Sequence, residues 1–94
     1  MRIIVRSAAH LAKIMGGRLI YTEMPEPSTL LDLLHTLSDT YGQEFYDAVC
    51  DGEGYVPRKV AILVNGSSAI AIGGVGISLK DEDDVLILPA ISGG

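Results

Sequence analysis

Apolar and polar residues alternate, or form short β-branched runs, in five stretches of this chain. Such stretches are typical of β-strands when Gly, Pro, Asn or Asp bounds them. They predict strands over residues 2–6, 18–24, 60–64, 67–72 and 85–88. The first two flank Gly16-Gly17 and are expected to pair with each other. Asn65-Gly66 is a strong signal for a tight hairpin between the third and fourth strands. Residues 8–15 are compatible with a helical turn or a loop.

The stretch after Pro25-Glu26-Pro27 has the spacing of one apolar helix face. Apolar side chains recur there at positions i, i+3, i+4, i+7 and i+11, which are Leu30, Leu33, Leu34, Leu37 and Tyr41. Either Ser28 or Thr29 can cap the N-terminus of this helix, and Gly42 is a natural stop at its C-terminus. We therefore predict one main helix, followed by a shorter helix over residues 43–50.

The order of these elements predicts an α+β fold. A chain of 94 residues is long enough for one domain with a modest core. We expect a mixed sheet of four to five strands packed against the main helix, which covers one face of the sheet. The folded domain is assigned to residues 1–88, and residues 89–94 are expected to form a flexible tail.

One face of the predicted sheet carries leucines where a half-buried strand normally has polar residues. If the Val and Ile residues of the 60–64 and 85–88 strands face the helix, then Leu63, Leu86 and Leu88 point away from it. A contiguous exposed apolar patch usually marks a partner-binding face. Burying three leucines against a partner would contribute about 5 kcal/mol before the costs of association. The alternative is that a loop or the second helix covers this face.

The charge balance bears on the choice of partner. The formal net charge is −5 and the seven basic residues are dispersed, whereas phosphate contacts need clustered Lys and Arg. We therefore expect no nucleic acid and favour a basic protein surface. The acidic run at 80–84 is interpreted as a solvated turn, with a docking contact as the alternative. We also expect no membrane contact, because no stretch approaches the roughly 18 apolar residues of a membrane span and the first residues do not form a signal peptide.

Two groups of side chains are candidates for chemistry. Cys50 is the one cysteine, which excludes an internal disulfide and a CxxC site and fits a reducing cytoplasm. We interpret it as inert packing rather than a nucleophile, because no His lies near it in sequence. His35 shares the polar side of the main helix with Asp32 and Asp39. A weak metal site is conceivable there, but we expect a solvated face and no bound metal.

The chain ends in Gly93-Gly94. Glycine has no Cβ, so such an end fits a narrow passage that any side chain would block. It would suit the delivery of one terminal carboxylate into the active site of another protein. With 11 glycines in 94 residues, this ending arises by chance roughly once in 70 sequences. The weight of the motif therefore comes from the residues that precede it.

Several of those residues resemble the MoaD/ThiS family of sulfur carriers, which are ubiquitin-like β-grasp proteins. The resemblance rests on Leu63-Val64-Asn65-Gly66, Gly73-Gly74, residues 79–83 and residues 85–94, in this order. It covers most of the chain and is specific when the pattern is complete and reaches the chain end. Molybdopterin synthase small subunits usually have Phe-Pro-Pro where this chain has Leu88-Pro89-Ala90. This ending is more similar to the carriers that serve cysteine biosynthesis.

The resemblance implies a covalent carrier that is not itself an enzyme and binds no cofactor. An E1-like adenylating enzyme would join the Gly94 carboxylate to AMP from Mg-ATP, and a persulfide or sulfide would then displace AMP to leave a thiocarboxylate. No protease would be needed, because no residue follows Gly94. Gly93 would give clearance in the partner's channel, while Ser92, Ile91 and Pro89 would orient the tail, proline by limiting its freedom. Leu63, Leu86 and Leu88 would form the docking face.

The resemblance also implies a second partner, the sulfur acceptor. We expect the molybdopterin pathway, with this chain as the small subunit of the synthase and the large subunit as the acceptor. A carrier for cysteine or thiamin biosynthesis is an alternative. So is a ubiquitin-like modifier, which would use the same tail to form an isopeptide bond with a target lysine. A third class, a binding module with an incidental Gly-Gly end, also remains open.

Overall fold

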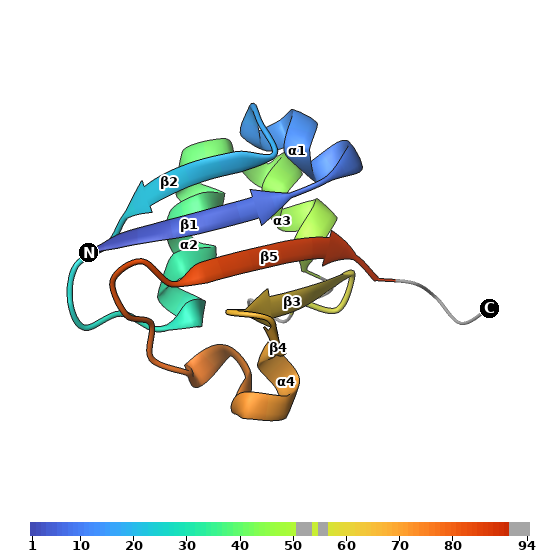
Figure 1. Cartoon of the computed structure of the whole chain (residues 1–94). Coiled ribbons are helices and arrows are strands. Elements are labelled where there is room, and N and C mark those ends of the chain that lie inside the picture. The colour runs from blue at the N-terminus through green and yellow to red at the C-terminus, as the bar shows by residue number, and fades with distance from the viewer. Residues whose placement is uncertain (51–53, 55–56, 91–94) are drawn as a thin grey trace.

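The first and last strands lie side by side at the centre of one sheet (Figure 1). The computed structural model describes residues 1–50, 54 and 57–90. Within these residues, five strands follow the order β2-β1-β5-β3-β4. Their bounds are β1 Arg2–Ser7, β2 Leu19–Glu23, β3 Val60–Val64, β4 Ser67–Ser68 and β5 Asp84–Pro89.

The sheet is mixed because its two central strands run parallel. β1 pairs with β5 in parallel, with Val5 opposite Val85, and pairs with β2 in the antiparallel sense. β3 is antiparallel to β5 and returns into β4 through the turn at Asn65-Gly66. Asn65 and Gly66 have φ angles of 51° and 85°, as the favoured two-residue hairpin turn requires. The predicted pairing of the first two strands and the predicted hairpin are both confirmed.

The main helix, α2 Leu30–Tyr41, begins at a reciprocal cap. Thr29 Oγ1 accepts the Asp32 N–H at 3.2 Å, and the Asp32 carboxylate accepts the Thr29 N–H at 2.9 Å. This capping box satisfies two N–H groups that the helix start would otherwise leave unpaired. Thr29 is thus the cap, while the hydroxyl of Ser28 donates instead to the carbonyl of Pro25. At the other end, the Gly42 N–H donates to the Ser38 carbonyl.

Shorter helices complete the chain: α1 Ala9–Met15, α3 Gln43–Val49, α4 Ala69–Ile72 and the 3₁₀ turn η1 Gly74–Gly76. The helices α2 and α3 lie behind the sheet in Figure 1 and α1 lies at its upper edge, so one sheet face is covered and the other is open. No helix in the described part of the chain is both long and apolar enough to cross a membrane.

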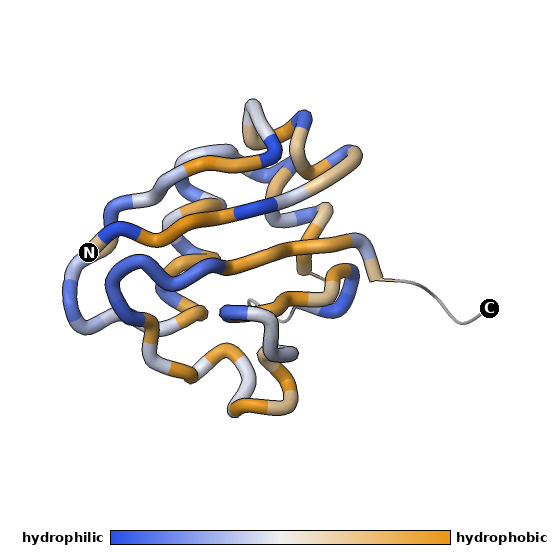
Figure 2. Tube along the Cα trace, in the orientation of Figure 1, coloured by the Kyte–Doolittle hydropathy of each residue, from blue (hydrophilic) through white to orange (hydrophobic). Residues whose placement is uncertain are grey.

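The core lies between the covered sheet face and these helices. Its fully buried side chains, none more than 1% exposed, come from β1, α2, α3 and β5: Ile3, Val5, Leu30, Leu33, Leu34, Leu37, Phe45, Val49, Val85 and Ile87. Figure 2 shows the corresponding hydrophobic runs in β1, β5 and β3. The predicted α+β architecture, with a main helix packed on a mixed sheet, is confirmed.

The prediction of a strand over residues 67–72 is wrong beyond its first two residues. Only Ser67–Ser68 pairs with β3, and Ala69–Ile72 forms the short helix α4. Periodicity cannot distinguish a short apolar run in a strand from one in a helix. The tertiary contacts decide: Ala69 is 5% exposed and belongs to the core, whereas Ile70 is 88% exposed. The 8–15 segment, left open between helical turn and loop, is the helix α1.

Candidate functional site

The open face of the sheet carries the three leucines that the sequence assigned to it. In the register between β3 and β5, Leu63 lies directly opposite Leu86 and Ala61 lies opposite Leu88. All three leucines are half-buried, while the residues that alternate with them, such as Ile87, are in the core. The predicted orientation is confirmed. The predicted second helix, α3, lies on the opposite side of the sheet, so it does not cover this face (Figure 1).

The open face extends further than the sequence indicated. Because β2 pairs with β1, the side chains of Leu19, Tyr21 and Ile4 share the face of Leu86. Leu19 is 40% exposed and Tyr21 is 57% exposed. Their alternation within one strand was visible in the sequence. Only the register of β2 against β1 shows which face they occupy, and no local signal gives that register.

Charged groups interrupt this apolar face, because Arg6 of β1 lies opposite both Leu19 and Leu86 and therefore between them. Arg6 Nε contacts Asp84 Oδ2 at 2.7 Å across β1 and β5. The Arg2 guanidinium lies 4.7 Å from the centre of the Tyr21 ring and bonds Glu82 at 2.8 Å. Its hydrogen bond and charge interaction with Glu82 raise the pKa of Arg2 above the usual value. The predicted turn at 80–84 therefore contains carboxylates that pair with β1 and are not merely solvated.

The root of the tail is attached to the sheet. Pro89, which the sequence analysis placed in the tail, is the last residue of β5 and lies opposite Val60. The next N–H, of Ala90, donates to the Lys59 carbonyl at 3.0 Å. The folded domain therefore includes Pro89 and Ala90, which lie beyond the predicted boundary at 88. The other predicted tail residues, Ile91, Ser92, Gly93 and Gly94, lie outside the described residues.

Cys50 is buried at the end of α3, with 2% of its surface exposed. Burial raises the pKa of its thiol, and the nearby positive charge of Lys59 only partly offsets this. A raised pKa disfavours the thiolate, which is the nucleophilic form. The geometry therefore agrees with a packing role for Cys50.

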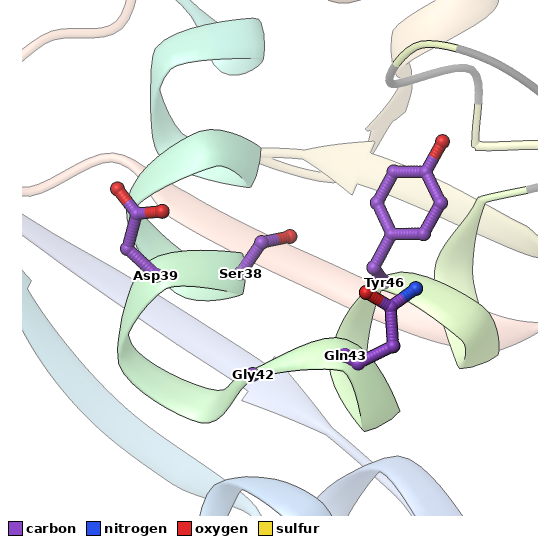
Figure 3. Close-up of a pocket in the computed structure, with 5 residues that line it drawn as sticks. All are labelled: Ser38, Asp39, Gly42, Gln43 and Tyr46. Atoms are coloured by element: carbon purple, nitrogen blue, oxygen red, sulfur yellow. The ribbon is translucent and has the colours of Figure 1, made fainter.

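A shallow polar hollow lies at the junction of α2 and α3 (Figure 3). It has a volume of about 310 Å³ and is lined by Ser38, Asp39, Gly42, Gln43 and Tyr46. The Ser38 hydroxyl is buried there without a hydrogen-bond partner in the described part of the chain. Gln43 already donates to Asp47 at 2.9 Å, and the Tyr46 hydroxyl donates to the Gly54 carbonyl. The hollow contains no Cys, His or Lys that could act as a nucleophile or transfer a proton near neutral pH.

Metal ligands do not gather around the residues that the sequence singled out. His35 lies on the exposed side of α2 with Asp32 and Asp39. Asp32 uses its carboxylate in the helix cap. Among the described residues, no group of three or more His, Cys, Asp or Glu side chains is placed to hold a metal ion.

Comparisons with known proteins extend over nearly the whole chain. The sequence model of the ThiS family matches residues 8–94. Small archaeal modifier protein 3 of Haloferax volcanii is 29% identical over 94 residues, which are 100% of both chains.

Solved structures share the fold. Urm1 from Trypanosoma brucei superposes with a TM-score of 0.81 at 26% identity, over 99% of this chain and 95% of that one. A putative molybdopterin converting factor, subunit 1, from Pyrococcus furiosus superposes with a TM-score of 0.76 at 26% identity, over 97% of this chain and 99% of that one. The shared fold thus extends over nearly the whole chain.

Proposed function

This chain belongs to the ThiS family and has a ubiquitin-like β-grasp fold, and from this premise we propose that it carries sulfur as a thiocarboxylate on Gly94. The observation that supports this most directly is the root of the tail beside an open apolar face. Ala90 is held to Lys59 at the end of β5, and Leu88 lies two residues earlier on the open face. Four residues beyond Ala90 can extend at most about 14 Å. A partner that receives Gly94 must therefore also lie close to this face.

The chemistry proposed for the tail needs an activating partner, because a carboxylate is a poor electrophile at neutral pH. One Gly94 oxygen would attack the α-phosphorus of Mg-ATP in an E1-like adenylating enzyme, and pyrophosphate would leave. Sulfide would then attack the acyl carbon and expel AMP, leaving a thiocarboxylate. A persulfide donor reaches the same product through an acyl disulfide that a thiol then reduces. This chain would be the substrate that is modified, with no catalytic group and no resident cofactor of its own.

The docking face proposed for these partners consists of Leu63, Leu86 and Leu88. Their partly exposed side chains offer apolar area, and the Arg6–Asp84 ion pair lies beside Leu86 on the same face. With a net charge of −5, the rest of the chain would favour a partner whose apolar patch has a basic rim. Gly93 would give clearance in the active site, and Ser92, Ile91 and Pro89 would set the direction of the tail.

We assign the carrier to molybdopterin biosynthesis, as the small subunit of the synthase with the large subunit as sulfur acceptor. The support is the similarity to the Pyrococcus protein named a putative molybdopterin converting factor. Cysteine or thiamin biosynthesis would use the same tail with a different acceptor. The compartment proposed is the cytoplasm, since ATP is needed and Cys50 is free.

The test is the intact mass of the protein after purification from its native cells, or after incubation with an adenylating enzyme, ATP and sulfide. We expect a species heavier by one sulfur less one oxygen. Removing Gly94 should abolish it. An unmodified mass under both conditions would contradict the proposal.

Cys50 provides the matched control, because a persulfide on this thiol would also add sulfur. A thiocarboxylate exchanges oxygen for sulfur, whereas a persulfide adds a whole sulfur atom, so the two masses differ. The Cys50→Ala variant should keep the sulfur gain in full. If the Cys50→Ala variant did not show this mass gain, the sulfur would be on Cys50 and not on Gly94, which would contradict the proposal.

A second candidate function is protein modification, which the name of the Haloferax relative favours. The adenylated Gly94 would then be attacked by a lysine amine of a target, giving an isopeptide bond. Conjugates of higher mass that carry this chain, seen on a denaturing gel and absent without Gly94, would support it. The two functions share activation and differ in the nucleophile, so both products can be sought in one sample.

A further inference from the structure

The outer edge of β3 is only partly paired. In an antiparallel pair, alternate residues direct their backbone groups to the same neighbour. The Lys59 carbonyl accepts from Ala90 and the Asn65 N–H donates to Asp84, so odd-numbered residues of β3 face β5. Val60, Ile62 and Val64 therefore direct their N–H and C=O groups to the outer edge.

In the part of the chain that the structure describes, only Val64 of these three residues has a partner strand there. β4 pairs with Leu63 and Val64 and then ends, because the chain turns into α4. Among the described residues, no backbone hydrogen bond joins Val60 or Ile62 to a segment on this side. An unpaired strand edge of this kind is a template for an extended segment of another chain.

An apolar groove runs along the same edge. It has a volume of about 610 Å³ and lies between β3, α4 and η1. Its apolar lining is contributed by Leu30, Pro57, Val60, Ala61, Ile62, Ala69, Ile70 and Val75. Figure 2 shows α4 as a hydrophobic segment at the periphery of the molecule. Ile70 is 88% exposed, so this side chain has little cover in the isolated chain.

The charge of the groove indicates what it would accept. Arg58 is the one charged residue among the described residues that line it, and it has no ion pair with any of them or with the rest of the described chain. Lys59 does not line the groove, because its ammonium group donates to the Asp47 carbonyl at 2.8 Å. A carboxylate on the incoming segment would find the Arg58 guanidinium at one end of the edge.

The groove is also continuous with the face proposed for docking. Ala61 lines the groove and lies opposite Leu88 on the open face. Lys59, which follows Arg58, holds Ala90 at the root of the tail. A partner seated on the leucines can therefore reach this edge without leaving the surface.

We infer that the β3 edge binds an extended segment of a partner protein by strand addition. The segment pairs its backbone with Val60 and Ile62, places alternate aliphatic side chains against Ile70 and the groove, and sets an acidic side chain beside Arg58. This second recognition site does not depend on the sulfur chemistry of the tail. Peptide binding tests this site, whereas the intact mass tests the carrier function, so either proposal can fail without the other.

The probe is a displayed library of random ten-residue peptides, selected against the full chain and followed by NMR of the ¹⁵N-labelled protein. We expect selected peptides with alternating aliphatic residues and an acidic residue at one end. Their binding should shift the amides of Val60 and Ile62 and slow the hydrogen exchange of both. Failure to select such peptides, or shifts confined to Leu63, Leu86 and Leu88, would overturn the inference.

Two isoleucines of α4 give a matched pair of variants. Ile70→Glu should lower the affinity for the selected peptide about tenfold or more, because it puts a charge into the groove. Ile72→Glu, at a 48% exposed residue that does not line the groove, should change the affinity by less than about threefold. If both variants lowered the peptide affinity equally, the groove beside Ile70 would not be the binding site.

Charge reversal tests whether the acidic end of the bound peptide lies beside Arg58. Arg58→Glu should lower the affinity for the acidic peptide about tenfold. Replacing the acidic residue of the peptide with lysine should restore binding to this variant. Absence of this rescue would remove Arg58 from the site. A concentration-dependent dimer in sedimentation that Ile70→Glu abolishes would assign the edge to a second copy instead and overturn the inference.

Discussion

At the scale of single residues, identical side chains have different tasks according to the direction in which they point. Leu33 of α2 is fully buried and belongs to the core, whereas Leu86 of β5 is half-buried on the open face. Removing a core leucine would create a cavity and lower stability. Removing Leu86 takes away area that a partner can cover, so its effect should appear mainly in binding.

Leu86→Thr tests this distinction. Threonine, unlike leucine, is β-branched and has a high strand propensity, so we expect thermal unfolding to change little. The apparent affinity for the adenylating enzyme should fall about tenfold, because part of a leucine side chain is no longer buried on binding. The measurement is the dependence of adenylation rate on carrier concentration.

The control for Leu86→Thr is Glu44→Gln, an exposed residue of α3 in the helical layer. It should leave both the adenylation rate and the apparent affinity unchanged. If both variants behave like the unaltered chain, the leucine face is not the docking face.

At the scale of elements, the segment between β4 and β5 contains a glycine, Gly73, that both its φ angle and its surroundings require. Gly73 ends α4 with a φ of 133°, a conformation that residues with a side chain rarely adopt. A Cβ at this position would lie 2.8 Å from Cγ2 of Ile77. Gly76 in η1 has neither restriction, since nothing lies within 4 Å of its Cβ position and its φ is not positive.

Gly73→Ala should therefore lower the free energy of unfolding by about 2 kcal/mol, through backbone strain and the contact with Ile77. The free energy of unfolding of Gly76→Ala should lie within about 0.5 kcal/mol of that of the original chain. Thermal or urea unfolding followed by circular dichroism compares the two. Equal stability of both variants would show that this segment adapts without cost.

At the scale of the whole molecule, the first and last strands of the chain are neighbours at the centre of the sheet. β1 and β5 are neighbours, and the Met1 ammonium group also donates to the Met24 carbonyl at 2.7 Å. The sheet therefore cannot be completed until the last strand joins the first. This long-range pairing makes the strand that leads to the last residues of the chain a central strand, with a hydrogen-bonded neighbour on each side.

Truncation tests this arrangement. A chain that ends at Ala90 should unfold at nearly the same temperature as the full chain, because β5 and the Ala90–Lys59 hydrogen bond are retained. A chain that ends at Asp84 should not fold cooperatively, because it lacks Val85 and Ile87 of the core. The measurement is the thermal transition by circular dichroism. Strong destabilisation by the shorter deletion would mean that residues 91–94 contribute to the fold.

The sequence alone determined the features that depend on local spacing and on side-chain chemistry. Leucines at helical intervals after a Ser-Thr pair predicted α2, and Asn65-Gly66 predicted the hairpin, because these signals act within a few residues. Alternation within β3 and β5 was also sufficient to place Leu63, Leu86 and Leu88 on one face. The Gly-Gly end and the segments that precede it led to the family.

The tertiary structure decided what depends on residues that are distant in sequence. The parallel pairing of β1 with β5 and the register of β2 added Tyr21 to the open face, since register is set by the pairing of whole strands. The fate of residues 69–72 was decided by the burial of Ala69 against the core, because a four-residue apolar run is compatible with either helix or strand. Within the described residues, the edge at Val60 and Ile62 is unpaired because β4 ends where that helix begins.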